Sequence, residues 1–187
     1  TGFIGENGRG TLELCGVEGR VDILTSTLGK ALGGSGGGFV ASKKEIIDKL
    51  RNKARPYLFS NNILPMTAAV GIEILNMLSK SKDLIKKSAE NTSYFRAKML
   101  EAGFDLRDAK AVHPVVPVML YDAILASKFA NMMIEEEGIY VIAFSFPVVP
   151  KNEARIRVQI SAAHTKEHLD AAIAAFVKVG KKLSVIK

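Results

Sequence analysis

Lys30 stands where a lysine side chain could react covalently with a carbonyl compound. Hydroxyl residues at 25–27 precede it, and glycines at 33, 34, 36, 37 and 38 follow it. The glycines let the backbone pass close to a bulky, flat ligand, while Ser26 and Thr27 supply small hydrogen-bonding groups beside the amine. A lysine attacks a carbonyl only through its deprotonated amine and therefore needs a protected setting. The pattern indicates covalent lysine chemistry.

Pyridoxal phosphate (PLP) is the cofactor that this pattern implies, because it is a flat carbonyl compound that lysines bind as an imine. The alternative is a solvated lysine in a glycine-rich turn, which is the commoner role of a lone Gly-Lys-Ala sequence. A phosphate-binding P-loop is excluded, since Lys30 precedes the glycines and Ala31 follows it. Residues 5–10 (GENGRG) are only a weak dinucleotide fingerprint, because no strand precedes them in the sequence.

The segments around Lys30 predict two short strands followed by helices. Residues 21–24 are expected to form a buried strand, and residues 39–41 a return strand. Ser42 and Glu45 have the spacing of a capping box, for a helix that ends near Lys53. A second, apolar helix is expected over residues 65–78.

The rest of the sequence predicts an α+β pattern. A helix over residues 82–102 should stop at Gly103. Strands are expected at 115–120, 139–144 and 155–160, and Asp122 and Thr165 are expected to cap two more helices, the first ending at Gly138. The last helix carries an apolar stripe that predicts packing against a small sheet; it consists of Leu169, Ile173, Phe176 and Leu183.

Four segments together resemble one enzyme family. They are STLGKALGGSGG, RPYLFSN, FSFPVVP and ARIRVQISAAHT, and the similarity runs from Thr1 to the C-terminus. The sequence is similar to the α-oxoamine synthases, which are fold-type I PLP-dependent transferases of the α/β class. The resemblance implies that residues 1–80 are the C-terminal part of the PLP-binding large domain and residues 81–187 the small α+β domain. It also implies that the Asp pairing with the pyridine nitrogen lies outside this chain, so the chain alone is not expected to be active.

The resemblance also assigns cofactor-binding roles. Lys30 would be the catalytic residue, both the covalent anchor of PLP and a general base. The hydroxyl of Thr27 would contact the cofactor phosphate. Ser60 and Asn61 match a segment that reaches the phosphate of the partner subunit, which implies a homodimer with a shared active site. Phe59 beside them would either line the site or lie in a core.

Arg157 would bind the carboxylate of the amino-acid substrate. Arg155 and Arg157 alternate along one strand and so project from the same face, and a planar guanidinium suits bidentate carboxylate recognition. Matching to the family favours Arg157, whereas Arg155 is expected to form a surface ion pair. His113 and His164 are expected to be structural, and His168 solvated.

Within the family, RPYLFSN and FPVVPKNEARIR favour the condensation of glycine with acetyl-CoA, which gives 2-amino-3-ketobutyrate and CoA. The alternatives are 8-amino-7-oxononanoate synthase, 5-aminolevulinate synthase and serine palmitoyltransferase, which share the lysine and the arginine. An alternative from another class is a non-catalytic oligomerisation module, which would apply if the polypeptide truly begins at Thr1.

The composition argues against several other classes of protein. The net charge of +7 comes from lysines spread over predicted helix faces near acidic residues, which argues against a nucleic-acid site. No apolar run is long enough to span a bilayer. The single cysteine, Cys15, excludes an intrachain disulfide, and a metal site is not expected. We expect a soluble protein of the cytoplasm or, in a eukaryote, of the mitochondrial matrix.

Overall fold

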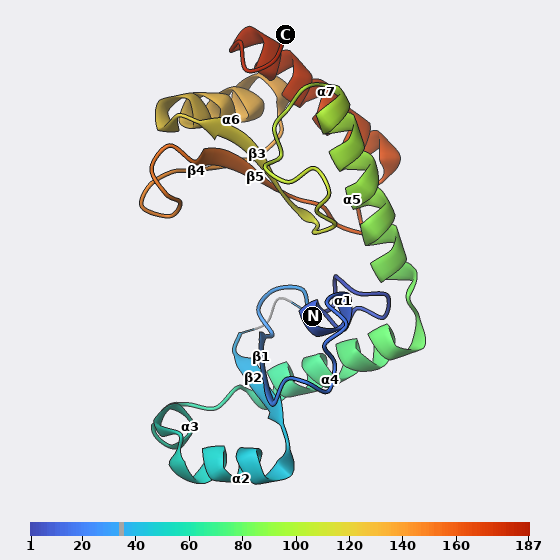
Figure 1. Ribbon diagram of the computed structural model, residues 1–187, viewed down its shortest axis with the longest axis vertical. Coiled ribbons are helices and arrows are strands. Elements are labelled where there is room, and N and C mark those ends of the chain that lie inside the picture. The colour runs from blue at the N-terminus through green and yellow to red at the C-terminus, as the bar shows by residue number, and fades with distance from the viewer. Residues whose placement is uncertain (34–35) are drawn as a thin grey trace. The chain divides into compact units, whose positions relative to one another are not determined.

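The structure is a computed structural model that describes residues 1–33 and 36–187 (Figure 1). Contacts divide the chain into two compact units, Thr1–Ile85 and Lys86–Lys187. The boundary between the units falls in the first turn of helix α5 (Asp83–Glu101). The roles assigned to the predicted domains 1–80 and 81–187 stay predictions. Gly34 of the predicted ligand loop lies outside the described residues.

The first unit contains an antiparallel pair of strands, β1 (Ile23–Thr27) and β2 (Gly38–Ser42), in which Ile23 pairs with Ser42 and Thr27 with Gly38. The predicted strand at 21–24 therefore begins later and extends through Thr27, because its length is fixed by pairing with β2. The expectation that it is buried was wrong: it belongs to a two-stranded sheet, and Ile23 is 48% exposed. The helices of this unit are α1 (Thr11–Leu14), α2 (Lys44–Lys53), α3 (Arg55–Phe59) and α4 (Pro65–Lys80).

Two local predictions in this unit were wrong or incomplete. Ser42 does not cap α2: its Oγ donates a hydrogen bond to the carbonyl of Asp22 at 2.6 Å, and Lys43 is the N-cap residue without a side-chain bond. Ser42 is the last residue of β2, so the strand pairing takes its side chain away from the helix. The short helices α1 and α3 were not predicted from the sequence.

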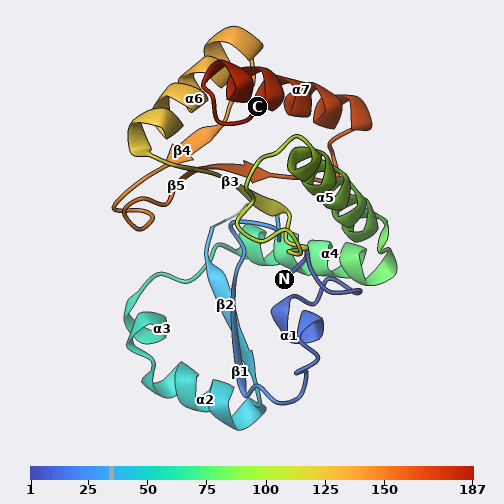
Figure 2. The ribbon, with the colours of Figure 1, turned by 45° about the horizontal axis from the view of Figure 1, so that its top comes forward.

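The second unit contains a three-stranded antiparallel sheet in the order β3-β5-β4. The strands are β3 (Val115–Tyr121), β4 (Ile142–Phe144) and β5 (Ala154–Gln159). Helices α6 (Ala123–Glu137) and α7 (Lys166–Lys182) lie on one side of this sheet, as Figure 1 and the turned view of Figure 2 both show. The predicted strand at 139–144 is shorter than expected, because only residues 142–144 pair with β5.

The core of this unit lies between the sheet and the helices. Four phenylalanines meet there, and the ring centroid of Phe176 lies 6.3 Å from that of Phe95, 6.0 Å from that of Phe104 and 5.4 Å from that of Phe129. The predicted apolar stripe of α7 is confirmed, since Leu169 and Phe176 are buried and Ile173 and Leu183 pack against the same core.

The predicted ends of the helices in the second unit are also confirmed. The side chain of Asp122 accepts a hydrogen bond from the N–H of Leu125 at 2.7 Å, and Thr165 accepts one from His168 at 3.3 Å. Gly138 ends α6 in the left-handed conformation with φ 67°, and Gly103 follows α5 with φ 93°. Glycine adopts such angles without the steric cost that a Cβ adds.

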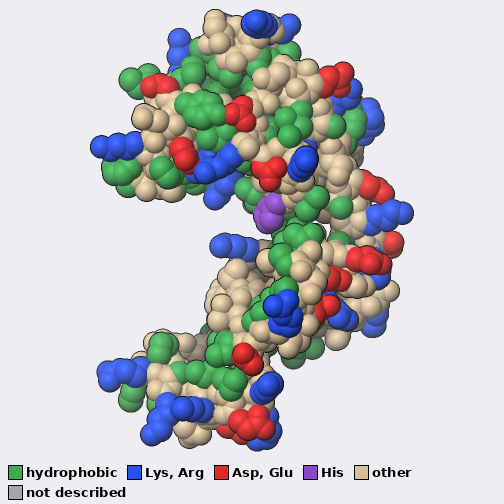
Figure 3. Space-filling view, viewed as in Figure 1, with side chains coloured by type: hydrophobic (Ala, Val, Ile, Leu, Met, Phe, Trp, Pro, Cys, Tyr) green, Lys and Arg blue, Asp and Glu red, His purple; other side chains and the backbone are tan. Residues whose placement is uncertain are grey.

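On the face drawn in Figure 3, Lys and Arg side chains are dispersed among Asp and Glu side chains. Within residues 1–33 and 36–187, no helix has both the length and the apolar composition needed to cross a membrane. The same residues hold no cluster of three or more His, Cys, Asp or Glu side chains that could bind a metal ion.

Candidate functional site

Lys30 lies on an ordered turn that presents its side chain to solvent. The turn directly follows β1, and the residues two before and two after the lysine are buried: Leu28 is 6% exposed and Leu32 is 2% exposed. Lys30 itself is exposed. Burial of the two leucines fixes the turn through the hydrophobic effect, so the amine between them is held at the surface on an anchored segment.

The hydroxyl of Thr27 sits at the start of the same turn. Its Oγ1 donates to the carbonyl of Gly37 and accepts from the N–H of Gly29, each at 3.3 Å. The N–H of Leu28 also donates to the Gly37 carbonyl, at 3.0 Å. These bonds tie the turn to the segment that leads into β2, and they place a hydroxyl three residues before the lysine.

Gly36 and Gly38 lack a side chain for different structural reasons. A Cβ on Gly38 would lie 2.6 Å from the backbone oxygen of Ser26, so only glycine permits the close pairing of β1 and β2 at this point. By contrast, a Cβ on Gly36 would meet no atom within 4 Å, which leaves open space beside the segment. An exposed amine, a hydroxyl and open space along glycine backbone are the donor set and the room that a phosphorylated aldehyde such as PLP requires, so these residues fit that cofactor.

Asn61 lies near this glycine segment, whereas Ser60 does not share its surroundings. A hollow of about 550 Å³ is lined by Asn61 together with Gly36, Gly37 and Thr67. Ser60 ends helix α3 in an extended conformation and does not line the hollow. Phe59 is 77% exposed, so its alternative placement in a core was wrong. The roles of Ser60 and Asn61 toward a phosphate stay predictions.

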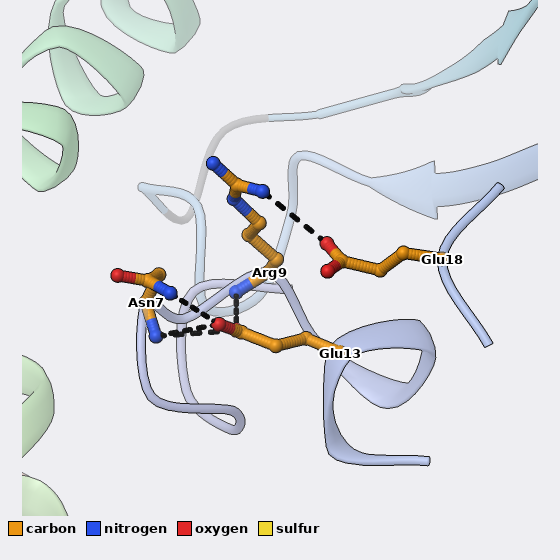
Figure 4. Close-up of polar contacts among 4 residues, drawn as sticks. All are labelled: Asn7, Arg9, Glu13 and Glu18. Atoms are coloured by element: carbon orange, nitrogen blue, oxygen red, sulfur yellow. Dashed lines mark hydrogen bonds and ion pairs between the residues drawn. The ribbon is translucent and has the colours of Figure 1, made fainter. Parts of the chain in front are cut away.

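The loop over residues 5–10 is held by a carboxylate rather than arranged as a nucleotide-binding turn. Glu13 accepts hydrogen bonds from the N–H groups of Asn7 and Arg9, at 2.9 and 3.0 Å, and Arg9 forms an ion pair with Glu18 at 3.3 Å (Figure 4). Desolvation raises the pKa of Glu13, but the bonds from Arg9 and Asn7 together lower it below its ordinary value. The Glu13 carboxylate occupies the N–H groups of Asn7 and Arg9, and the sequence alone did not reveal this interaction.

Arg155 and Arg157 of β5 have different surroundings in the second unit. Arg155 lies 3.8 Å from the carboxylate of Glu153, which also pairs with Arg107 at 2.7 Å. Arg157 is exposed and makes no ion pair among the described residues; instead its guanidinium carbon lies 4.2 Å from the centroid of the Phe144 ring. The predicted ion pair of Arg155 is confirmed, and Arg157 keeps its N–H donors available.

The histidines have structural contacts. His113 Nδ1 accepts a hydrogen bond from the N–H of Val115 at 3.0 Å, and His164 Nδ1 accepts one from Ser161 at 3.2 Å. Burial lowers the pKa of both side chains, assisted by Arg96 in the case of His113 and by His168 in the case of His164. His168 caps its own helix through the N–H of Thr165. His113 and His164 therefore act as neutral acceptors for the backbone.

Comparison with known proteins shows the family to which the chain belongs. The family model described as aminotransferase class I and II matches residues 2–176. The chain belongs to this aminotransferase family. It is 52% identical to the 2-amino-3-ketobutyrate coenzyme A ligase of Escherichia coli K12 over 99% of this chain and 46% of that protein. It is 47% identical to the 8-amino-7-oxononanoate synthase of Thermosipho melanesiensis over the same shares.

A solved member of the family has the same fold. The serine palmitoyltransferase from S. paucimobilis with a bound PLP–myriocin aldimine superposes with a TM-score of 0.91 at 27% identity, covering 100% of this chain and 46% of that one. The predicted α/β fold class of a PLP-dependent transferase is confirmed. The chain spans about half the length of the curated relatives that it matches.

Phe144 contacts Arg157 in this aminotransferase-family chain, and the sequence analysis did not predict this contact. Phe144 lies in the FSFPVVP motif, but the motif does not show which arginine the ring touches. That contact depends on the register of β4 against β5, in which Phe144 faces Arg155 and Ile142 faces Arg157. The alternation of both strands was a partial signal, since it places all these side chains on one face.

Proposed function

We propose that the whole protein is a PLP-dependent glycine C-acetyltransferase, also called 2-amino-3-ketobutyrate CoA ligase. It would condense glycine with acetyl-CoA to form 2-amino-3-ketobutyrate and release CoA. The observation that carries this proposal is the exposed Lys30 on a turn anchored by Leu28 and Leu32, with the hydroxyl of Thr27 beside it. The 52% identity to the bacterial ligase supports the choice of reaction.

Each residue has a defined task in this proposal. Lys30 would hold the cofactor through Nζ; once the amine of glycine has replaced it there, the freed Lys30 amine would take the proton from the α-carbon of glycine as the general base. Thr27 donates its hydroxyl to the cofactor phosphate, in exchange for its 3.3 Å bond to Gly37. When bound, PLP supplies an electron sink that stabilises negative charge on the α-carbon.

Arg157 binds the carboxylate of glycine in this proposal. Its guanidinium is exposed and carries no carboxylate partner among the described residues, whereas Arg155 is engaged by Glu153. An arginine without an internal partner can offer two parallel N–H bonds to an incoming carboxylate. The difference between the two arginines supports Arg157 as the residue that selects an amino acid.

We also propose that the protein works as a homodimer with shared sites, in which Ser60 and Asn61 reach the phosphate bound to the partner subunit. The segment around them exposes large apolar side chains on α3, on the connection that follows it and at the start of α4, which would be covered by a second subunit. These side chains are Tyr57, Leu58, Phe59, Ile63, Leu64 and Met66.

The shared site is tested by mixing Lys30→Ala subunits with Asn61→Ala subunits, each expected to be inactive alone. If the sites are shared, the mixed dimer regains activity; if each subunit has its own complete site, it does not.

The proposed reaction is tested on the whole protein with PLP, glycine and acetyl-CoA. The expected result is a visible absorption band that borohydride bleaches, with the reduced adduct on the peptide that contains Lys30. Lys30→Ala should lose turnover while its thermal midpoint stays near that of the parent, because an exposed lysine contributes little packing. Normal turnover in this variant, or no band in the parent protein, would refute the proposal.

A second candidate reaction is that of 8-amino-7-oxononanoate synthase, which the 47% identity to the Thermosipho protein favours. Alanine with a longer acyl-CoA, assayed beside glycine with acetyl-CoA, separates the two reactions by the ratio of their kcat/KM values.

For the compartment we propose the cytoplasm of a bacterium or, in a eukaryote, the mitochondrial matrix. The lone and exposed Cys15 is compatible with a reducing compartment.

A further inference from the structure

The ring of Phe144 lies against the guanidinium of Arg157. Strands β4 and β5 are antiparallel, with Ile142 opposite Arg157 and Phe144 opposite Arg155. Alternate residues of a strand share a face, so these four side chains project on the same side of the sheet. Phe144 nevertheless stacks diagonally on Arg157, at 4.2 Å from the guanidinium carbon to the ring centroid. Diagonal neighbours across antiparallel strands are within reach of aromatic and long side chains.

The opposite face of these strands builds the core. Ile156 is fully buried, and Ala143 packs against the same core cluster. Phe144 is only partly buried and does not belong to that cluster. Its ring is therefore not needed to fill the interior of the unit, and a substitution at this position leaves no cavity among the core side chains.

The ring contact restrains Arg157 without using its hydrogen-bond donors. A cation over an aromatic face is attracted by the ring quadrupole, while the N–H groups of a guanidinium point outward in its own plane. Arg155 differs, since its ion pair with Glu153 directs it toward a carboxylate of the protein itself. Phe144 can thus hold Arg157 in place while the edge of the guanidinium stays free for a ligand.

We propose that Phe144 is a positioning residue for Arg157, which it holds in the orientation that binds the carboxylate of the amino-acid substrate. This inference rests on the proposed function of Arg157. Without the ring, the long arginine side chain would have to lose more conformational freedom on binding glycine. The cost would fall on glycine affinity and not on the acetyl-CoA site or on the proton transfer by Lys30.

The test compares Phe144→Leu with the parent in the whole enzyme. We expect Phe144→Leu to raise the KM for glycine roughly 2- to 10-fold, the range that a lost cation–π contact allows. The kcat, the KM for acetyl-CoA and the thermal midpoint should stay close to parent values. Phe144→Tyr should restore the glycine KM, since it keeps the ring. Calorimetric titration with glycine gives the same comparison without turnover.

Two further variants make the outcome specific. Ile142→Ala removes apolar volume from the position directly opposite Arg157 but leaves the ring, and it should not change the glycine KM. In an Arg157→Ala background, Phe144→Leu should have no additional effect. If Arg157→Ala weakens glycine binding and Phe144→Leu does not, the inference fails and the proposed function stands. If Arg157→Ala leaves glycine binding unchanged, the proposed role of Arg157 fails, and the inference with it.

Discussion

A Cβ atom on Gly38 would lie 2.6 Å from the backbone oxygen of Ser26. This distance is far inside van der Waals contact, and the neighbour is backbone, which cannot rotate away. Gly38 also pairs with Thr27 across the two strands. The position of the Thr27 hydroxyl, and with it the turn that carries Lys30, therefore depends on a glycine at position 38.

Gly38→Ala is predicted to destabilise the whole protein and to weaken PLP retention. The added methyl group must push β1 and β2 apart, and overpacking of this kind costs about 1–3 kcal/mol. The measurements are the free energy of unfolding and the amount of cofactor retained after dialysis. Gly36→Ala is the matched control for the free energy of unfolding, because its Cβ would meet no atom within 4 Å. An equal loss of unfolding free energy in the two variants would contradict the proposed dependence on strand pairing.

Gly180 tests the packing of the core in the second unit. Gly180 lies in α7, and a Cβ there would be 2.7 Å from Cζ of the buried Phe104. Because Phe104 meets the ring of Phe176, it has little room to move. Gly180→Ala is predicted to lower the free energy of unfolding by about 1–3 kcal/mol, measured by chemical denaturation.

Gly71, in helix α4 of the first unit, has room for a Cβ atom, unlike Gly180. A Cβ there would lie 3.5 Å from a methyl group of Leu28, which is ordinary contact. Since alanine favours helix by about 1 kcal/mol over glycine, Gly71→Ala should be neutral or stabilising. A loss of stability in Gly71→Ala equal to that in Gly180→Ala would contradict the assignment of the Gly180→Ala loss to the contact with Phe104.

The sequence predicted those features that depend on neighbouring residues. Asp122 and Thr165 bond to N–H groups three residues later, and Gly138 ends its helix by its own conformational freedom. All three are local effects, so a short sequence window contains the information. The lysine turn was also visible, since its glycines and hydroxyl residues lie within one segment.

Features that depend on strand pairing were not predictable in the same way. Ser42 has capping-box spacing, yet its hydroxyl bonds to Asp22, twenty residues away, because pairing of β1 with β2 brings them together. The contact between Phe144 and Arg157 likewise depends on the register of β4 against β5. A one-residue shift in register would move the ring to the other face, and no local pattern fixes that register.

The N-cap of α6 gives a fourth prediction. Asp122 accepts the N–H of Leu125 at 2.7 Å and so satisfies one of the unpaired donors at the start of the helix. Asp122→Ala is expected to lower the free energy of unfolding by about 1 kcal/mol, whereas Asp122→Asn, which keeps an accepting oxygen, should change it by only a few tenths. Urea titration of both variants checks this, and an equal loss in both would mean that the carboxylate charge matters more than the cap.

The last prediction concerns the pH dependence of stability through His164. Burial, with a contribution from His168, lowers the pKa of His164 in the folded protein, and its Nδ1 must be unprotonated to accept the N–H of Ser161. As the pH falls below the unfolded value of about 6.5, the unfolded chain binds the proton first, so stability drops until the folded pKa is reached. The stabilisation is complete above that unfolded value.

His164→Asn removes the titrating group and keeps an oxygen that can accept the Ser161 N–H. The loss of unfolding free energy between about pH 8 and about pH 5 should therefore be smaller in the variant than in the parent. Because burial, with Arg96, also lowers the pKa of His113, part of the pH dependence should remain until His113→Asn is added. Urea titrations at both pH values measure the differences. An unchanged pH dependence in His164→Asn would show that the side chain is protonated equally in the folded and unfolded states, contrary to its burial beside the Ser161 backbone.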